Sequence, residues 1–253
     1  MQVTTENTGL YIISSSNKHI PLSQDAENYK DGIVILLDKP YKWTSADAVR
    51  KVKFRLQKFF KSKNIKVGHA GTLDPLATGM LVICIGKATK LAESFQAQEK
   101  EYLAEIELGA TTPCYDLEKE VDARYPFEHI SRDLIEQVIP SFLGKQEQIP
   151  PIFSAKLIDG NRAYEYARAG VEKEMKPASI EIHEMSIVSF DLPSLLLSIR
   201  CSKGTYVRSI ARDIGLKLES GGHLTNLRRT RSGKFLASEA LSMEDIEFLF
   251  PLQ

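Results

Sequence analysis

The feature of this sequence that most constrains its fold is a series of short β-type segments along almost the whole chain. The runs GIVILLDKP (32–40) and LVICI (81–85) are continuously apolar, which predicts buried strands. The segment EYLAEIELGA (101–110) alternates instead, so that Tyr102 shares the apolar face of a third strand. Three more strands are predicted at SIEIHEMSIVSF, LLLSIRC and LTNLRRTRSG.

Helical patterns fill the intervals between these strands. Ser45 is predicted to cap a helix that extends to about Phe60. Further helices are predicted at 87–95, 131–142, 162–168 and 205–218 and in the last segment, SMEDIEFLF. We therefore predict an α/β (α+β) fold with a mixed, mainly antiparallel sheet flanked by helices. The predicted domain covers residues 32–253, and residues 1–31 are expected to form an extension or a loosely packed edge.

Composition excludes several classes of protein. Of the 253 residues 43% are apolar, which is enough for a sizeable core, but the longest apolar stretches are far too short to span a bilayer. The N-terminus has no basic segment followed by an apolar run, so no secretory signal is predicted. The three cysteines are widely separated and form no CxxC motif. We expect a reduced cytoplasmic protein with no metal site and no membrane association.

The charge of the chain is balanced overall but unevenly distributed. There are 33 basic and 33 acidic residues, yet the segment Arg50–Lys66 contains eight basic residues and no acidic one. A second basic segment spans Arg200–Lys234, whereas acidic residues concentrate at 99–122. Two such segments can form one phosphate-binding face if the fold brings them together. Solvated helix faces would produce the same pattern, so charge alone leaves both interpretations open.

A loop with the sequence GHAGTLDPLATG (68–79) contains the first candidate catalytic residue. Asp74 lies between Leu73 and Pro75, and the loop is too rich in Gly, Pro and Thr for a regular element. Glycines let the backbone approach a ligand closely, and proline stiffens the turn after the carboxylate. Taken alone, these residues are also compatible with an ordinary turn Asp that accepts bonds from nearby amides.

Longer motifs add a family resemblance. GHAGTLDPLATGML resembles the signature loop of the TruB family, bacterial synthases that make pseudouridine at position 55 in the T arm of tRNA. LDKPYKWTS is similar to the family's N-terminal motif, with Lys42 in place of the usual glycine. EKEYLAEIELG, SKGTYVRSIARDIG and HLTNLRRTRSG resemble further family segments in the same order. The resemblance covers roughly residues 32–235 and implies a pseudouridine synthase domain.

The resemblance implies roles for two charged residues. Asp74 matches the essential carboxylate, which acts as nucleophile or as base at the sugar, and the sequence leaves these two roles open. Arg208 matches the arginine that pairs with that carboxylate, and a guanidinium can hold a carboxylate at two points. A surface arginine in the first turn of a helix is the alternative for Arg208.

Four further residues match positions that contact the substrate in the family. Tyr102 matches the tyrosine that stacks on the target base, while Tyr206 and Leu227 match other substrate contacts. His69 matches the histidine that contacts RNA in the space left by the target uridine, which must leave its stack to reach Asp74. Packing in the core is the alternative for Tyr102, Tyr206 and Leu227, and a structural role is the alternative for His69.

Other family features are less completely matched. Asp116 aligns with a family aspartate, but PCYDLEKE lacks the glycine common there, so no role follows. An insertion at about 146–170, including Tyr164, resembles the segment that clamps the T loop. Within it Lys156 stands one position earlier than in the usual motif. The chain ends about twenty residues after RTRSG, and no C-terminal RNA-binding domain of the PUA type is expected there.

The resulting expectation is a monomeric enzyme that binds the T stem-loop of tRNA and uses no cofactor, metal or guide RNA. Three alternatives differ in class or specificity. A non-catalytic RNA-binding protein could retain the fold, although Asp74, Tyr102 and Arg208 together argue for activity. A pseudouridine synthase of another specificity, such as a guide-dependent one, is the second alternative. A glycosidase acting on a small nucleoside is the third, and the chain lacks its two-carboxylate pattern.

We predict that Asp74→Asn abolishes turnover while the fold and tRNA affinity stay largely intact. The amide keeps the shape of the carboxylate and removes the charge on which the chemistry depends. Pseudouridine yield and a filter-binding isotherm should be measured on the same preparation. Residual activity within about tenfold of wild type would exclude Asp74 from this role.

Overall fold

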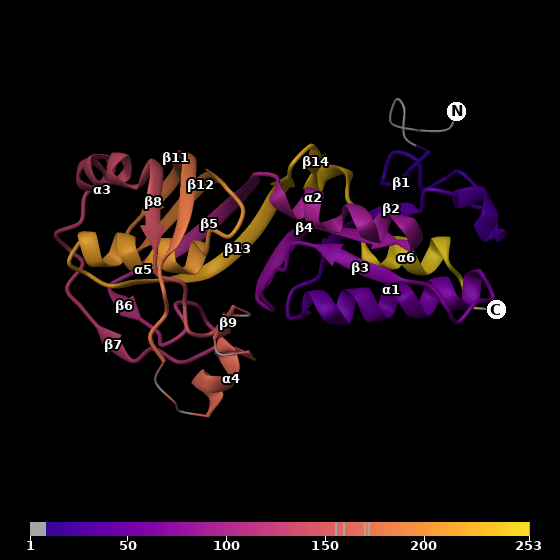
Figure 1. Ribbon diagram of the computed structural model, residues 1–253. Coiled ribbons are helices and arrows are strands. Elements are labelled where there is room, and N and C mark those ends of the chain that lie inside the picture. Colours follow the sequence, from indigo (N-terminus) through magenta and orange to yellow (C-terminus); the bar gives the residue numbers. More distant parts are fainter. Residues whose placement is uncertain (1–8, 155, 159, 170, 172, 253) are drawn as a thin grey trace. The chain divides into compact units, whose positions relative to one another are not determined.

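The computed structural model describes residues 9–154, 156–158, 160–169, 171 and 173–252. The chain forms two compact units, each described by itself (Figure 1). The first unit contains the described residues up to Glu101 and those from Arg228 onward, and the second is Tyr102–Leu227. Strand β13 (Gly222–Ser232) crosses this boundary, so it contributes residues to both units.

The first unit contains a mixed sheet. The strands pair in the order β1-β2-β4-β13, with β3 also on β4 and β14 on β13. The β1–β2 pair is parallel, whereas β4 is antiparallel to both β2 and β3. The elements are β1 (Tyr11–Ile13), β2 (Ile33–Lys39), β3 (Val67–Ala70), β4 (Ala77–Ile85), β14 (Phe235–Leu236), α1 (Ser45–Phe59), α2 (Ala92–Ala97) and α6 (Met243–Leu249), with 3₁₀ turns η1 (Ala26–Tyr29), η2 (Gly86–Leu91) and η4 (Ala237–Glu239).

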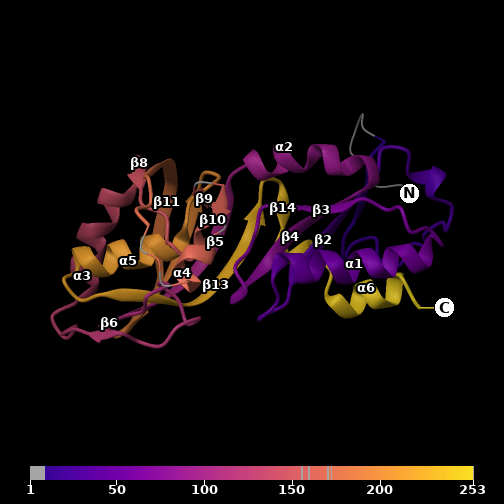
Figure 2. The same cartoon turned by 60° about the horizontal axis from the view of Figure 1, so that its bottom comes forward.

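Both faces of this sheet are covered, which explains why its central strands are continuously apolar. Figure 2 shows α2 on one side of the strands and α1 with α6 on the other. Val34 and Leu36 of β2 belong to the cluster on which Phe95 of α2 packs. On α1 the buried positions recur at helical spacing, and Phe59 meets Phe250 edge to face at 5.2 Å between ring centroids. Burial on both faces holds β2 and β4 rigidly between the helices.

The second unit contains an antiparallel sheet with helices beside it. Its strands follow the order β13-β5-β12-β11-β8, and β11 is antiparallel to both β12 and β8. The elements are β5 (Lys100–Leu108), β6 (Ala110–Thr111), β7 (Ala123–Arg124), β8 (Gly144–Gln148), β9 (Leu157–Ile158), β10 (Asn161–Arg162), β11 (Ala178–Asp191), β12 (Ser194–Cys201), α3 (Arg132–Val138), η3 (Ile139–Phe142), α4 (Ala163–Arg168) and α5 (Val207–Lys217).

Helix α5 is fixed closely against the start of β13. Val207, Ile210 and Ile214 form its buried face. At Gly215 an added Cβ would lie 2.2 Å from the carbonyl carbon of Gly221, so only glycine permits this approach. The close packing positions the first turn of α5, which carries the predicted Arg208.

The predicted fold class is confirmed, and so is the strict alternation of β5, where Tyr102 is buried. Four local predictions were wrong. The helix is capped by Thr44, whose side chain accepts from the backbone N–H of Asp47, and Ser45 is its first residue. The segment 67–70 is strand β3, and 144–148 is strand β8, although both were predicted as loops. The described part of the N-terminal segment is not loosely packed, because β1 pairs with β2 and Ile13 is buried, whereas residues 1–8 lie outside the described residues.

Candidate active site

The predicted site residues divide between the two units. Asp74 and His69 belong to the first unit. Tyr102, Tyr206, Arg208 and Leu227 belong to the second. Each group has its own supporting contacts, and these contacts decide how firmly each side chain is held.

Asp74 is partly exposed and lies directly before the turn that leads into β4. Ser45 fixes the preceding residue, because its hydroxyl accepts from the N–H of Leu73 at 2.9 Å and donates to the Leu73 carbonyl at 3.2 Å. Lys39 fixes the following residue, with its ammonium 3.2 Å from the Pro75 carbonyl. The Asp74 carbonyl accepts from the N–H of Ala77 at 3.1 Å, which closes the turn.

Arg229 holds the same loop from another side. Its guanidinium donates to the carbonyls of Gly71 at 3.0 Å, Thr72 at 3.4 Å and Met80 at 2.7 Å. This arginine is 1% exposed, so its charge is neutralised mainly by carbonyl dipoles. At Gly79 an added Cβ would lie 2.3 Å from the Arg229 carbonyl oxygen. The glycine therefore allows β13 to approach the end of the Asp74 loop.

The outer edge of the loop is held by an ion pair. Asp38 accepts from the N–H of Gly79 at 3.1 Å. The same carboxylate receives two bonds from Arg228, at 3.1 and 2.6 Å. Backbone groups on both sides of Asp74 therefore have partners outside the loop, at Gly71, Thr72, Leu73, Pro75, Gly79 and Met80. Leaving such a buried group without a partner costs about 1–3 kcal/mol, so the loop has few low-energy alternatives.

Buried positive charge surrounds this loop. Lys39 is fully buried, and its ammonium donates to the carbonyls of Pro40, Trp43 and Pro75. Burial lowers the pKa of Lys39 to about 8, the Asp74 charge acting in the opposite direction and Arg229 in the same direction. The charges of Lys39 and Asp74 act favourably on each other.

His69 lies on β3 in the same unit. Burial lowers the pKa of its imidazole, and the nearby Arg229 charge lowers it further. A neutral ring at physiological pH follows. Its Nδ1 is buried and finds no hydrogen-bond partner among the described residues.

Arg208 is the most constrained residue of the second group. Its guanidinium donates to the carbonyls of Cys114 at 3.2 Å and Phe153 at 2.9 Å. Its Nε lies 3.6 Å from a carboxylate oxygen of Asp116, and both side chains are buried. Asp116, to which the sequence gave no role, therefore helps to orient Arg208. A buried cation with several fixed acceptors keeps one geometry.

Tyr206 precedes α5 and is fixed through its backbone. The buried amide of Gln148 accepts from the Tyr206 N–H at 2.8 Å and donates to its carbonyl at 3.1 Å. Tyr102 is buried on β5, and Leu227 is partly exposed on β13. The structure thus places Tyr206 and Arg208 together at the start of α5.

The insertion at about 146–170 begins as strand β8 and contains β9, β10 and α4. Lys156 donates to the carbonyl of Lys176 at 2.8 Å. Residues 155, 159 and 170 of the insertion, and the side chain of Tyr164, lie outside the described part of the chain.

The two basic segments differ in how far their charges are neutralised. In the second segment five of the six arginines form ion pairs: Arg200 with Glu184, Arg208 with Asp116, Arg212 with Asp213, Arg228 with Asp38 and Arg231 with Glu99 and Glu101. In the first segment Lys58 and Lys61 are exposed and have no ion-pair partner among the described residues. The second segment likewise has exposed lysines with no ion-pair partner in the described part of the chain, namely Lys203, Lys217 and Lys234. The expectation that both segments carry RNA binding therefore stays a prediction.

Sequence reasoning missed three supporting residues, namely Lys39, Ser45 and Arg229. Each stands inside a motif that had been noticed, LDKPYKWTS or HLTNLRRTRSG. In the sequence, each could have been noticed as a polar residue within a segment predicted to form a buried strand or helix. Among the described residues no cluster of three or more His, Cys, Asp or Glu side chains is arranged to hold a metal ion. No helix in the described part of the chain is long and apolar enough to cross a membrane.

Comparisons with known proteins agree with this organisation. Residues 57–207 match the model of the TruB family pseudouridylate synthase N-terminal domain, and residues 208–250 match the tRNA pseudouridylate synthase B C-terminal domain. The chain is 52% identical over 217 residues to tRNA pseudouridine synthase B of Phocaeicola vulgatus, covering 86% of this chain and 92% of that one. It is 44% identical to the protein of the same name from Clostridium kluyveri, covering 72% of that chain.

Solved structures show the same likeness at lower identity. The chain resembles one from a Cbf5-Nop10-Gar1 complex with a TM-score of 0.65 and 28% identity. A chain in an H/ACA RNP bound to a substrate RNA containing 2'-deoxyuridine gives a TM-score of 0.63 and 26% identity. The matches cover 86% and 87% of this chain, which spans about half the length of those two, 54% and 53%.

The lowered pKa of Lys39 leads to a prediction about how the reaction rate depends on pH. The single-turnover rate on a T-arm RNA should fall as pH rises through about 8, because Lys39 then loses the charge that stabilises Asp74. The pKa of this lysine is lower in the folded chain than its ordinary 10.5, so between about pH 8 and 10.5 the unfolded state binds more protons. Rising pH therefore favours folding through this group, and unfolding at Lys39 cannot explain the loss.

Thermal melting in the same buffers provides the control for stability. The variant Lys39→Arg keeps its positive charge over this pH range. It therefore distinguishes titration of Lys39 from titration of the RNA bases. In a folded Arg variant the rate should lose the step near pH 8. A wild-type rate that is constant from pH 7 to about 9.5 would contradict the assignment.

Proposed function

Because the chain belongs to the TruB family of pseudouridylate synthases, we propose that it converts uridine 55 in the T arm of tRNA to pseudouridine with Asp74 as its catalytic carboxylate. The observation that supports this most directly is the loop of Asp74, which is held on both sides by Ser45, Lys39 and Arg229. Preorganised groups of this kind lower the barrier because they need no rearrangement during the reaction.

The reaction is an isomerisation of one nucleotide. The bond between ribose C1′ and uracil N1 breaks, the base turns, and C1′ joins to C5. The proton on C5 leaves and N1 gains one, so that no oxidant, reductant or leaving group is required. Positive character develops at the sugar while the first bond breaks, and a carboxylate beside it stabilises or captures that charge. Both roles of Asp74 require its ionised form.

The remaining residues would bind the extruded uridine. Tyr102 would stack on the base, while Tyr206 and Leu227 would be further contacts to it. Arg208 would pair with the catalytic carboxylate, and its hydrogen bonds to the Cys114 and Phe153 carbonyls and its ion pair with Asp116 leave its guanidinium preoriented. His69, with a neutral ring, would occupy space that the uridine leaves in the RNA.

The substrate is a T stem-loop, and the enzyme would work as a monomer without a guide RNA, in the cytoplasm where tRNA is modified. The insertion at about 146–170 would close over this one RNA loop. Structured RNA is recognised largely by shape and backbone contacts, which suits a small, compact substrate.

We predict that a short T-arm stem-loop is modified in excess EDTA at a rate comparable to that of full-length tRNA. The contacts proposed for the enzyme reach only this arm. A stem-loop with cytidine at the target position is the matched control and should give no product. If full-length tRNA reacts and the stem-loop does not, recognition extends beyond the T arm. Loss of activity in EDTA with the RNA still folded would contradict the cofactor-free mechanism.

RNA binding should depend on the first basic segment. We predict that Lys58→Glu with Lys61→Glu weakens tRNA binding and flattens its dependence on salt, because fewer counterions are released. Single-turnover chemistry at saturating enzyme should stay nearly unchanged. The matched control is Lys119→Glu with Lys145→Glu, which makes the same charge change at exposed lysines outside both segments. An affinity that is insensitive to salt, or equal losses in the two pairs, would refute the assignment.

A further inference from the structure

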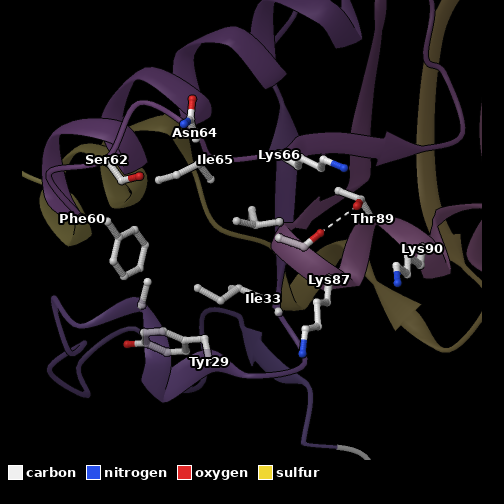
Figure 3. Close-up of a pocket in the computed structure, with 14 residues that line it drawn as sticks. Tyr29, Ile33, Phe60, Ser62, Asn64, Ile65, Lys66, Lys87, Thr89 and Lys90 are labelled. Atoms are coloured by element: carbon white, nitrogen blue, oxygen red, sulfur yellow. Dashed lines mark hydrogen bonds between the residues drawn. The ribbon is translucent and has the colours of Figure 1, made fainter.

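A second cavity lies within the first unit, away from the loop of Asp74. It has a volume of about 420 Å³, within the range of small-molecule sites. It is formed where η1, the end of α1, the start of β3 and η2 come together (Figure 3). Ile85, at the far end of β4 from the Asp74 loop, is one of its lining residues. The length of β4 corresponds to about 26 Å, so the cavity is separate from the catalytic carboxylate.

One part of this cavity is aromatic and apolar. The rings of Tyr29 and Phe60 line it and meet edge to face, with 5.8 Å between their centroids. Ile33 and Ile65 lie beside them in Figure 3. The hydroxyl of Tyr29 donates to the Ser23 carbonyl at 3.2 Å, which fixes the ring. A flat apolar group would find an immobile surface here.

The other part of the cavity is basic and polar. Lys66, Lys87 and Lys90 line it and are exposed. Figure 3 shows them on the side away from the two rings. Asn64 and Thr89 add polar groups, and no lining residue is acidic. Three lysines at one side of a cavity without an acidic lining residue favour an anion, and phosphate is an anion that lysines commonly bind.

We propose that this cavity binds a nucleoside monophosphate unit, with its base against Tyr29 and Phe60 and its phosphate at the lysines. The unit is either a free nucleotide or an unpaired nucleotide of an RNA. Both have a planar base and a phosphate close to each other. The cavity has an aromatic part for the base next to a basic part for the phosphate. Lys66 also ends the basic segment Arg50–Lys66, so a strand bound along that segment would lead to the cavity. The proposal does not depend on the synthase activity.

Calorimetric titration with AMP and UMP tests the site, with adenosine and inorganic phosphate as partial ligands. The nucleotides should bind, and each partial ligand should bind at least about tenfold more weakly. Lys87→Gln with Lys90→Gln should weaken nucleotide binding by about tenfold or more, because charge-assisted bonds are lost. These lysines are exposed, so the fold should be unaffected. Lys61→Gln with Lys63→Gln, adjacent lysines that do not line the cavity, is the matched control.

The aromatic side is tested by Tyr29→Leu against Tyr29→Phe. Binding of adenosine and AMP should fall in the Leu variant and recover in the Phe variant, which retains the ring. Circular dichroism and melting confirm that both variants fold. Nucleotide binding that is absent, that survives Lys87→Gln with Lys90→Gln, or that falls equally in the control pair would overturn the proposal.

A third measurement distinguishes the two sources of the ligand. The affinity of a T-arm stem-loop is compared with that of the same stem-loop carrying a single-stranded extension. A gain that disappears in the Lys87/Lys90 variant assigns the cavity to RNA, whereas nucleotide binding without such a gain assigns it to a free nucleotide. Repeating the nucleotide titration on Asp74→Asn keeps the two proposals distinguishable. That variant should retain nucleotide binding while it loses pseudouridine formation.

Discussion

The candidate catalytic half of this protein depends on two buried cations that bind backbone carbonyls. Lys39 and Arg229 are among the largest fully buried side chains, and both donate to carbonyls of the loop around Asp74. A buried cation is costly unless its donors are satisfied, so the loop must keep the geometry that satisfies them. The charge of Lys39 also acts favourably on that of Asp74. Loss of Lys39 would therefore affect both the geometry of the loop and the electrostatics of Asp74, whereas Arg229 holds the loop through its carbonyls.

In each unit, one buried polar side chain binds both backbone groups of a residue close to a candidate site residue. Ser45 binds both the N–H and the carbonyl of Leu73, directly before Asp74. Gln148 does the same for Tyr206, two residues before Arg208. In each case a buried polar side chain replaces the pairing that a strand or helix would give to an irregular residue. Such residues need no contact with the substrate, yet they fix the backbone from which a candidate site residue projects.

Much of the fold could be predicted because its signals are local. The alternation of β5 and the spacing of buried residues on α1 follow directly from the sequence. Strand β3 was missed because GHAG has little β propensity, and only its pairing with β4 makes it a strand. The candidate site was identified by motif, but its supporting contacts join segments far apart in the chain. Neither Arg229 at the carbonyl of Gly71 nor Asp116 at Arg208 could be derived from sequence spacing.

The same limit explains how a chain of zero net charge can bind a polyanion. In sequence the two basic segments look equivalent, but their acidic partners come from distant residues. Arg228 meets Asp38 and Arg231 meets Glu99, so those positive charges are used within the fold. On α1 only part of the charge is used, since Lys51 and Arg55 share Glu247. The acidic residues thus neutralise most arginines of the second segment and leave its exposed lysines and the exposed Lys58 of α1 without an ion-pair partner within the described residues. The potential that RNA would encounter is set by this pairing rather than by the net charge.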